Sequence, residues 1–382
     1  MSDPFWEDAA RKDPLWAILS DPAKKDRGWK LGEFFETGRR EISLLLHQLE
    51  ALGASPRRGT ALDFGCGVGR LSQALAPSFD RVTGIDISPT MVRLADLLNQ
   101  WPNKVQYLLN ADANLSVVPS ESQDFIYSDV VLQHVPPEQA RRFIGEFFRV
   151  LSRGGVVVFQ LTAERRPDAD ARVRVSAMPE SAYSAAVEVV GGLDENLAIG
   201  ETVDLSVRVA NRSPVAWDQA RYGAIRVGNH WLASGGAMLI QDDGRTLLDR
   251  TISPGQECQM RLIVQAPVRP GTYLCEIDLV HEGVTWFGDR GSQTFRRSVR
   301  VGEALASRGP FESQPTKSVE YPDIYRELPQ EPAEIGAFPM YGVPLAEVHS
   351  LIAAAGGRCV YVEPDDRGGP EWVGYRYFCV NP

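Results

Sequence analysis

One segment decides the fold expected of this chain: Thr60-Ala61-Leu62-Asp63-Phe64-Gly65-Cys66-Gly67-Val68-Gly69-Arg70. An apolar strand runs into glycines at alternate positions, and a helical pattern with Leu71 and Leu75 follows at once. Because glycine has no Cβ, alternate glycines let the backbone of a tight turn approach a ligand closely. The free N–H groups at the start of the helix face the same ligand. The segment therefore predicts a small-molecule site between a strand and a helix.

The residues around the glycines argue against two common nucleotide-binding motifs. A phosphate-binding loop ends in Gly-Lys-Ser or Gly-Lys-Thr, which is absent here. A dinucleotide fingerprint needs glycine where Arg70 stands, which disfavours a nicotinamide-dependent oxidoreductase. The acid Asp63, just before the first glycine, suits a ligand with a cationic amine instead. The pattern Asp63-x-Gly65-x-Gly67-x-Gly69 resembles motif I of the class I S-adenosylmethionine-dependent methyltransferases.

Length and composition set broad limits on the protein. A chain of 382 residues indicates two or three domains, and a formal charge of −10 argues against a nucleic-acid or anionic-membrane binder. No apolar run approaches the roughly 20 residues of a membrane span. The start Met1-Ser2-Asp3-Pro4 is not that of a signal peptide, so we expect a cytoplasmic protein. The five cysteines form no Cys-x-x-Cys pair or His/Cys cluster, so we expect reduced thiols and no metal site.

Strands and helices alternate after the glycine loop. The predicted strands are Arg81–Asp86, Val105–Leu109, Asp124–Ser128 and Val156–Leu161, and the helices between them are Pro89–Leu98 and Pro137–Leu151. Such alternation implies parallel pairing with right-handed crossovers, hence a doubly wound, Rossmann-like α/β sheet. Ligands of such sheets bind beyond the carboxyl ends of the strands. Asp63, Asp86, Asp112 and Ser128 all fall at such ends.

The methyltransferase resemblance gives each of these positions a role toward S-adenosyl-L-methionine. Asp86 follows the glycines by about 20 residues, the spacing at which an acid reaches a ribose diol. The resemblance further implies that Ile87 and Met91 enclose the adenine. Alternatively, Asp86 and Asp112 each cap the N-terminus of a helix.

The remaining cofactor contacts also follow from the resemblance. Asp112 would accept from the adenine amino group, the Ala113 amide would donate to a ring nitrogen, and the Ser128 carbonyl would accept from the methionine ammonium. The cofactor-binding set implied is Asp63, Gly65, Cys66, Gly67, Gly69, Asp86, Ile87, Met91, Asp112, Ala113 and Ser128.

The methyl acceptor is expected to approach the segment that begins at Ser128. His134 lies there and titrates near neutral pH, so it is a candidate base for a hydroxyl acceptor. Alternatively, His134 caps the following helix or packs over the cofactor. A helix from Leu31 to Leu52, with Phe34 and Phe35, either packs on the sheet or closes over the ligand. The acceptor is expected to be a small or sugar-like molecule, methylated on oxygen.

The alternation of helix and strand stops after Leu161. A charged linker spans Ala163 to Asp170, and period-two alternation then predicts strands in three runs: Val203 to Val209, Met260 to Val264 and Tyr273 to Leu279. These runs indicate an immunoglobulin-like β-sandwich. It resembles modules of bacterial polysaccharide-building glycosyltransferases and methyltransferases.

After a Pro-rich return linker over 302–335, a helix (Val343–Ala355) and two strands (Arg358–Val362 and Tyr375–Val380) resume the first pattern. They resemble the elements that complete the seven-stranded methyltransferase sheet. We therefore expect a core with an N-terminal cap at 1–163, an inserted sandwich with its linkers at 164–335, and the end of the core at 336–382.

The function of the sandwich is left with two alternatives. Six aromatic residues lie in it, some near acids: Trp217, His230, Trp231, His281, Trp286 and Phe287. In one alternative these rings are exposed and stack on a glycan. In the other they form a hydrophobic core, and the sandwich serves as a scaffold or dimer contact. A rival to the enzyme is a cofactor-binding scaffold or sensor whose sandwich binds carbohydrate or protein. The sequence does not indicate an oligomeric state.

Overall fold

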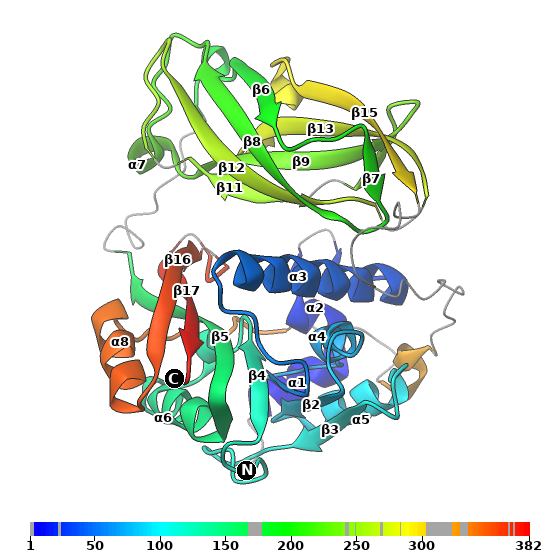
Figure 1. Cartoon of the computed structure of the whole chain (residues 1–382), viewed down its shortest axis with the longest axis vertical. Helices are drawn as coiled ribbons and strands as arrows, with labels where there is room; N and C mark the ends of the chain where they lie inside the picture. The colour runs from blue at the N-terminus through cyan, green and yellow to red at the C-terminus, as the bar shows by residue number, and fades with distance from the viewer. Residues whose placement is uncertain are drawn as a thin grey trace. The chain divides into compact units, whose positions relative to one another are not determined.

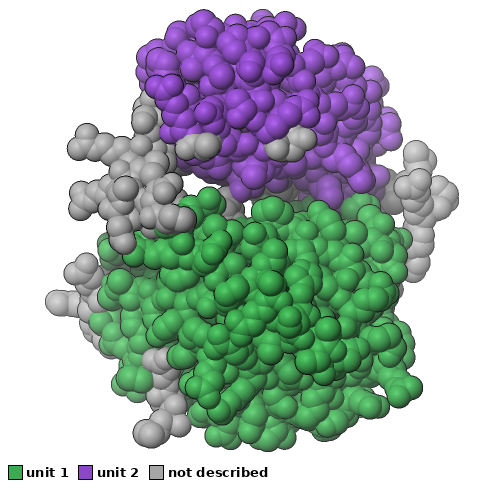
Figure 2. Space-filling model, turned by 90° about the vertical axis from the view of Figure 1, so that its left-hand side faces the viewer, with its two compact units in different colours: residues 1–172, 317–382 green, residues 173–316 purple. Residues whose placement is uncertain are grey.

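The computed structural model divides the chain into two compact units, shown in different colours in Figure 2: residues 1–172 with 317–382 (unit 1), and residues 173–316 (unit 2). The structure describes residues 4–21, 24–166, 178–240, 244–248, 250–267, 270–282, 284–302, 323–328, 335–365, 367–369 and 371–382. Most of the two predicted linkers, at 167–170, 303–322 and 329–334, lies outside the described residues.

A seven-stranded sheet forms the centre of unit 1, in the order β16-β17-β5-β4-β1-β2-β3 (Figure 1). Its strands are β1 (Thr60–Phe64), β2 (Arg81–Asp86), β3 (Val105–Leu109), β4 (Gln123–Ser128), β5 (Leu151–Arg165), β16 (Arg358–Asp365) and β17 (Trp372–Val380). The first five strands pair in parallel, whereas β17 pairs antiparallel with both β5 and β16. The predicted mixed α/β fold with a seven-stranded sheet is confirmed.

Helices cover both faces of this sheet. They are α3 (Leu31–Ala51), α4 (Arg70–Leu75), α5 (Pro89–Leu97), α6 (Pro137–Val150) and α8 (Leu345–Ala354), with the short turns η2 (Leu132–His134) and η5 (Ile324–Glu327). Phe147 of α6 and Ile352 of α8 share one hydrophobic cluster with Phe159 of β5. Leu45 of α3 and Leu75 of α4 share another with Phe125 of β4. The central strands are therefore buried on both faces, which explains their nearly continuous apolar sequence.

The carboxyl-terminal hairpin completes the sheet. Strand β17 pairs with β5 from Trp372 opposite Arg165 to Val380 opposite Val156. Strand β5 thus extends past the domain boundary expected at residue 163. The Val343 N–H donates to the Thr162 carbonyl at 2.9 Å, so the returning chain meets the end of β5 directly.

Two short helices precede α3 and cover the glycine loop. Helices α1 (Pro4–Lys12) and α2 (Pro14–Ile18) share a hydrophobic cluster with Phe34, Val68 and Met91. The Glu7 carboxylate of α1 accepts from the Ser88 hydroxyl at 2.6 Å and from the Thr90 amide at 3.1 Å. No helix among the described residues is long and apolar enough to cross a membrane.

Unit 2 is built of two sheets around one core. The larger has the order β10-β9-β13-β15-β7, with β11 beside β9 and β14 beside β13, and the smaller has the order β12-β8-β6. Its elements are β6 (Ala185–Gly191), β7 (Asn196–Ala198), β8 (Thr202–Asn211), β9 (Ile225–Ala233), β10 (Met238–Ile240), β11 (Arg245–Leu247), β12 (Glu257–Gln265), β13 (Gly271–His281), β14 (Thr285–Trp286), β15 (Phe295–Gly302), α7 (Gln219–Tyr222), η3 (Glu180–Ala182) and η4 (Gly288–Arg290).

Most of the aromatic residues proposed to face a glycan lie inside unit 2. Trp217, Trp231 and Phe287 belong to its core and are fully buried. His281 is also fully buried, where its Nδ1 meets the Tyr183 hydroxyl at 3.0 Å. The aromatic ligand surface is therefore wrong for these four residues, because their side chains lie in the interior of unit 2.

Truncation after Gly302 is predicted to destabilise unit 1, although it removes none of the predicted site residues. The shortened chain would lose β16 and β17 and leave the apolar edge of β5 unpaired, which favours aggregation. Size-exclusion chromatography and circular dichroism should therefore show an aggregated or partly unfolded protein.

The matched control replaces residues 173–316 with a short Gly/Ser linker and keeps both parts of unit 1. We expect it to give a soluble core with one cooperative unfolding transition, because a changed connection length alters closure entropy only slightly. The prediction that unit 2 is an insertion would be contradicted if the truncated chain folds and the linker variant does not.

Candidate functional site

The glycine loop has a backbone that only glycine adopts easily. Gly65, Gly67 and Gly69 have φ values of +79°, +53° and +84°, all in the left-handed region. A Cβ on Gly65 would lie 2.3 Å from a methyl carbon of Val131, and one on Gly67 would lie 2.4 Å from Cδ1 of Ile18. The alternate glycines are therefore required by both conformation and space.

Main-chain bonds fix this loop against the sheet. The amides of Gly65 and Cys66 both donate to the Ile85 carbonyl, at 2.8 and 2.9 Å. Cys66 is buried, and burial raises the pKa of its thiol well above the ordinary value. Cys66 thus serves the loop through its backbone, and its thiol stays protonated.

Asp86 joins the end of β2 to the glycine loop. The Gly67 amide donates to its Oδ2 at 2.8 Å and the Ser88 amide to its Oδ1 at 2.9 Å. Burial raises the pKa of this carboxyl, and the two amide bonds oppose the rise. The helix-capping alternative is wrong here, because the cap of α5 is Ser88, whose hydroxyl accepts from the Met91 amide at 3.1 Å. Asp86 therefore faces the loop with further acceptor capacity for a ligand.

Asp63 and Ser128 lie at the ends of two neighbouring strands. Asp63 pairs with Tyr127 across β1 and β4, which places Ser128 next to it along the sheet. Asp63 is buried, and the Ser72 hydroxyl donates to its Oδ2 at 2.5 Å. Burial raises the pKa of Asp63 to about 7. Ser128 is fully buried and its hydroxyl has no hydrogen-bond partner among the described residues.

The residues expected around the adenine are in different surroundings. Met91 is buried in the hydrophobic cluster with Val68, and Ile87 is half-buried. Asp112 is exposed and, with Ala113, lines a cavity of about 630 Å³ against Arg142, Gly145 and Glu146 of α6.

Asn110, which the sequence reading did not single out, connects this loop to Asp86. Its side-chain amide donates to the carbonyls of Asp112 and Asn114 at 3.2 and 2.9 Å, and its backbone amide donates to the Asp86 carbonyl at 2.9 Å. Because no helix starts after Asp112 in the described loop, the capping alternative is wrong for this residue too.

His134 has hydrogen-bond partners on both ring nitrogens. Its Nδ1 lies 2.7 Å from the Pro339 carbonyl, which can only accept, so Nδ1 carries the proton. Its Nε2 lies 3.1 Å from the side-chain amide nitrogen of Gln133, whose oxygen accepts from Gln160 at 2.9 Å. Burial lowers the pKa of His134, so the ring is neutral at pH 7.

The structure distinguishes between the alternatives for His134, which are capping of helix α6 and packing in the pocket. Helix α6 has Pro136 at its N-cap and no side-chain capping bond, so His134 does not cap it. Its ring packs instead against Trp6, with 5.1 Å between ring centroids, and against Phe338 at 6.0 Å.

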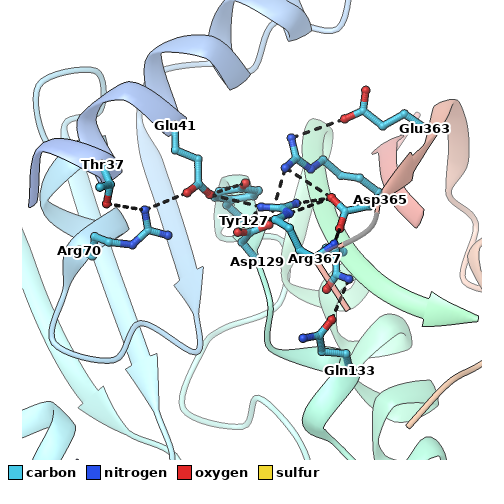
Figure 3. Close-up of polar contacts among 11 residues, drawn as sticks. Thr37, Glu41, Arg70, Tyr127, Asp129, Gln133, Glu363, Asp365 and Arg367 are labelled. Carbon is cyan, nitrogen blue, oxygen red and sulfur yellow. Dashed lines mark hydrogen bonds and ion pairs between the residues drawn. The ribbon is translucent and has the colours of Figure 1, made fainter. Parts of the chain in front are cut away.

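A network of buried and partly buried charges borders the ends of β1 and β4 (Figure 3). Glu41 of α3 is paired with Arg70 at 2.8 Å and accepts from the Tyr127 hydroxyl at 2.7 Å. Burial opposes ionisation, but Arg70, Arg367 and Arg376 lower the pKa of Glu41 to about 2. Glu41 is therefore a permanent negative charge.

The carboxyl-terminal hairpin supplies the other half of this network. Arg367 is paired with Asp129 at 2.5 Å and with Asp365 at 2.6 Å, and Arg376 lies 3.9 Å from Asp129. Burial raises the pKa of Asp129 to about 6 although Arg367 opposes the rise. One oxygen of Asp129, Oδ1, has no hydrogen-bond partner among the described residues.

The sequence reading missed Glu41, Asp129, Arg367 and Arg376, and gave Arg70 only a negative role. A local signal existed for two of the five, because Arg70 directly follows Gly69 and Asp129 directly follows Ser128. No local signal existed for Arg367, which is separated from Asp129 by 238 positions and reaches it only through the sheet.

The donor set of this site has a definite chemical preference. Asp63 and Asp86 offer carboxylate oxygens, and the glycine loop admits close contact with a ligand backbone. The described residues contain no cluster of three or more His, Cys, Asp or Glu suited to a metal ion. The arrangement thus fits a ligand that carries both a diol and a cationic amine.

Comparison with known proteins assigns the segment that carries this site. Residues 62–159 match the family model described as a methyltransferase domain. The chain is 35% identical over 112 residues to 2-methyl-6-phytyl-1,4-hydroquinone methyltransferase of Synechocystis sp., covering 29% of this chain and 34% of that protein. It is 35% identical over 108 residues to ubiquinone biosynthesis O-methyltransferase of Nitrosospira multiformis, covering 28% and 44%. The chain thus spans less than half the length of these two relatives.

Among solved structures, an S-adenosylmethionine-dependent methyltransferase from Clostridium acetobutylicum aligns over 90% of both chains, with a TM-score of 0.37 and 10% identity. Residues 62–159, which carry the glycine loop, Asp63, Asp86 and Ser128, are therefore similar in sequence to a methyltransferase domain.

Proposed function

We propose that the protein transfers the methyl group of S-adenosylmethionine to an oxygen of a small or sugar-like acceptor. The observation that carries the proposal is the bond from the Gly67 amide to Asp86, within a loop of three left-handed glycines. This loop lies in the segment that matches the methyltransferase-domain model.

The residues of the loop fit the cofactor chemically. Asp86 would accept from the two ribose hydroxyls, each bond to the charged carboxylate contributing about 1.5–3 kcal/mol. Asp63 and the Ser128 carbonyl, at adjacent strand ends, would hold the ammonium group. An ammonium beside Asp63 favours the ionised carboxylate, which offsets the effect of burial on its pKa. When bound, the cofactor supplies a methyl group that its sulfonium charge has already activated.

The protein then has three tasks: to align the acceptor, exclude water and remove a proton. Trp6 and Phe338 pack around His134 and shield that side of the site. A neutral His134 is ready to accept a proton at Nε2, once the acceptor hydroxyl replaces the Gln133 amide there. Asp129, fixed by Arg367, would accept from a second polar group of the acceptor through Oδ1, which lies 3.9 Å from Arg376 and has no hydrogen-bond partner among the described residues.

The choice of oxygen rests on the comparisons, and the origin of the acceptor rests on unit 2. One relative is named an O-methyltransferase, and that name supports an oxygen acceptor. The proposed link to bacterial glycan biosynthesis rests on the likeness of unit 2 to an immunoglobulin-like sandwich. The domain assignment, with unit 2 inserted in a cytoplasmic methyltransferase core, belongs to the same proposal.

A second candidate is a cofactor-binding sensor or scaffold without turnover. The observation that favours it is the engagement of both His134 nitrogens, so this candidate base is occupied in this conformation. Incubation of the full chain with methyl-labelled S-adenosylmethionine and a panel of phenols, quinols and sugars distinguishes the two. Labelled product supports the enzyme, whereas saturable cofactor binding without product supports the sensor.

Replacing Asp86 by alanine or asparagine is predicted to weaken cofactor binding by well over tenfold, because ribose donors lose a charged acceptor. Isothermal titration calorimetry with S-adenosylhomocysteine measures the effect. Asp96→Ala, which removes an exposed acid of α5, is the matched control and should bind normally. An unchanged dissociation constant in both Asp86 variants would mean that the ribose is held elsewhere.

His134→Ala is predicted to lower turnover by about two orders of magnitude while cofactor affinity stays nearly intact, if the imidazole removes the acceptor proton. The pH profile of turnover should lose its acid limb in this variant. His349→Ala, which removes an exposed histidine of α8, is the control. Equal losses of turnover and cofactor affinity would instead make His134 a packing residue of the pocket.

A further inference from the structure

A second cavity, of about 270 Å³, lies within unit 2, on the face of the larger sheet that points away from the hydrophobic core. On strands β9 and β13, Trp231, Cys275 and Ile277 point into the core. Their neighbours His230 and Glu276 therefore point to the opposite face. Glu276 stands opposite His230 on one side and opposite Arg296 of β15 on the other, so the three form a polar row across adjacent strands.

The polar residues of this outer face are enclosed. His230, Glu276 and Asp278 are only 3%, 5% and 3% exposed. The outer face of an antiparallel sheet normally meets water with its polar side chains extended into solvent. Here β14, the turn η4 and the β9–β10 hairpin contribute Trp286, Gly288 and Met238 to the walls of the cavity. Burying charged side chains costs free energy, so their enclosure in this cavity indicates a role other than solubility.

Trp286 forms an apolar wall of the cavity. Its indole lies over Gly228, where a Cβ would come within 2.6 Å of a ring carbon. The His230 ring is packed beside it, with 4.1 Å between centroids. Since glycine at position 228 makes room for the indole, the wall is part of the built structure and not a mobile side chain at the surface.

The acids of the cavity keep acceptor capacity for a ligand. The Thr294 hydroxyl and Arg296 Nε both donate to the same oxygen of Glu276, at 2.5 and 2.8 Å, and neither uses its Oε2. Among the described residues, Asp278 accepts only from backbone amides, those of Leu279 and Gly288, at 2.7 and 2.9 Å. Burial raises the pKa of Asp278 to about 7, as expected for a carboxyl taken from water without a cationic partner.

The charge of the lining selects against anions. Three carboxyl groups (Glu276, Asp278 and Asp289) line the cavity with one guanidinium (Arg296), and these four groups sum to −2 when Asp278 is ionised and to −1 when it is protonated. A phosphate or a uronic acid would meet net repulsion there. The cavity also lies below the range of about 300–1,000 Å³ typical of drug-sized ligand sites, so it suits a single ring.

We propose that this cavity is a binding site for one uncharged sugar ring, held by Glu276, Asp278, Asp289 and Arg296 and packed against Trp286. Vicinal hydroxyls donate to a carboxylate and accept from a guanidinium. The Arg245 guanidinium lies over the Trp286 ring, 5.1 Å from its centroid, so the C–H groups of a pyranose would pack against the part of the indole that lines the cavity. The argument uses unit 2 alone and does not depend on methyl transfer.

Sugar binding is tested with the full chain and no cofactor. The probes are D-glucose, D-galactose, D-mannose, L-rhamnose and N-acetyl-D-glucosamine. Binding of each is measured by saturation-transfer NMR and by titration of the sugar in the millimolar range. At least one probe should bind saturably, while D-glucuronic acid should bind more weakly than D-glucose. Because no cofactor is present, the outcome is separate from that of the methyl-transfer assay.

Two variants locate the binding in the cavity. Trp286→Ala removes the apolar wall, and Asp289→Asn changes an exposed residue whose replacement leaves the core intact. Each should weaken binding of the best probe by about tenfold, the effect of losing one charge-assisted bond or one ring contact. Glu188→Gln, an exposed acid of the smaller sheet paired with Arg208, is the matched control and should bind as the parent does. Thermal unfolding confirms that each variant is folded.

Several results would overturn the proposal. They are no saturable binding of any neutral probe, preference for the uronic acid, or equal binding by the parent chain and the folded Asp289→Asn variant. A site that instead accepts a protein segment would give the first of these results.

Discussion

Strand β5 depends on a partner that the chain supplies only near its end. One edge of β5 pairs with β4, and the other edge is bonded by β17, from Val156 opposite Val380 to Arg165 opposite Trp372. Without β17, a row of backbone N–H and C=O groups along an apolar strand would lose its partners. This requirement fixes the carboxyl-terminal hairpin on the sheet, however much chain lies between the two strands.

The same hairpin brings charge to the functional edge of the sheet. Arg367 and Arg376 meet Asp129, which follows β4, and Glu41 joins them to Arg70 at the end of the glycine loop. In such a largely buried network, removal of one partner leaves an uncompensated charge and is destabilising. The network therefore ties four separate stretches of chain into one rigid border beside Asp63 and Ser128, and a rigid border is what alignment of two reactants needs.

Unit 2 shows how one pattern serves two purposes. Alternation along β9 and β13 places Trp231 and Ile277 in the core and His230 and Glu276 on the other face. The aromatic residues that stand out in the sequence mostly belong to the core, whereas the acids that line the cavity are inconspicuous in the sequence. Period two specifies the face of each side chain, but the loops that enclose one face are specified by contacts between distant segments.

The local sequence determined the glycine loop, the parallel α/β core and the positions of Asp63, Asp86 and Ser128. These depend on backbone conformation, periodicity and the rule that parallel strands end at one edge, all of which act over a few residues. The helix and two strands that complete the sheet could also be predicted, because each has its own period. Only the tertiary structure decided that Arg367 pairs with Asp129 and that the Gln133 amide contacts Nε2 of His134. It also decided that Trp217 lies in the core of unit 2 while Trp286 lines a cavity. Those outcomes depend on contacts between side chains of separate strands and loops. Burial and electrostatic pairing at such contacts cannot be predicted from local sequence spacing.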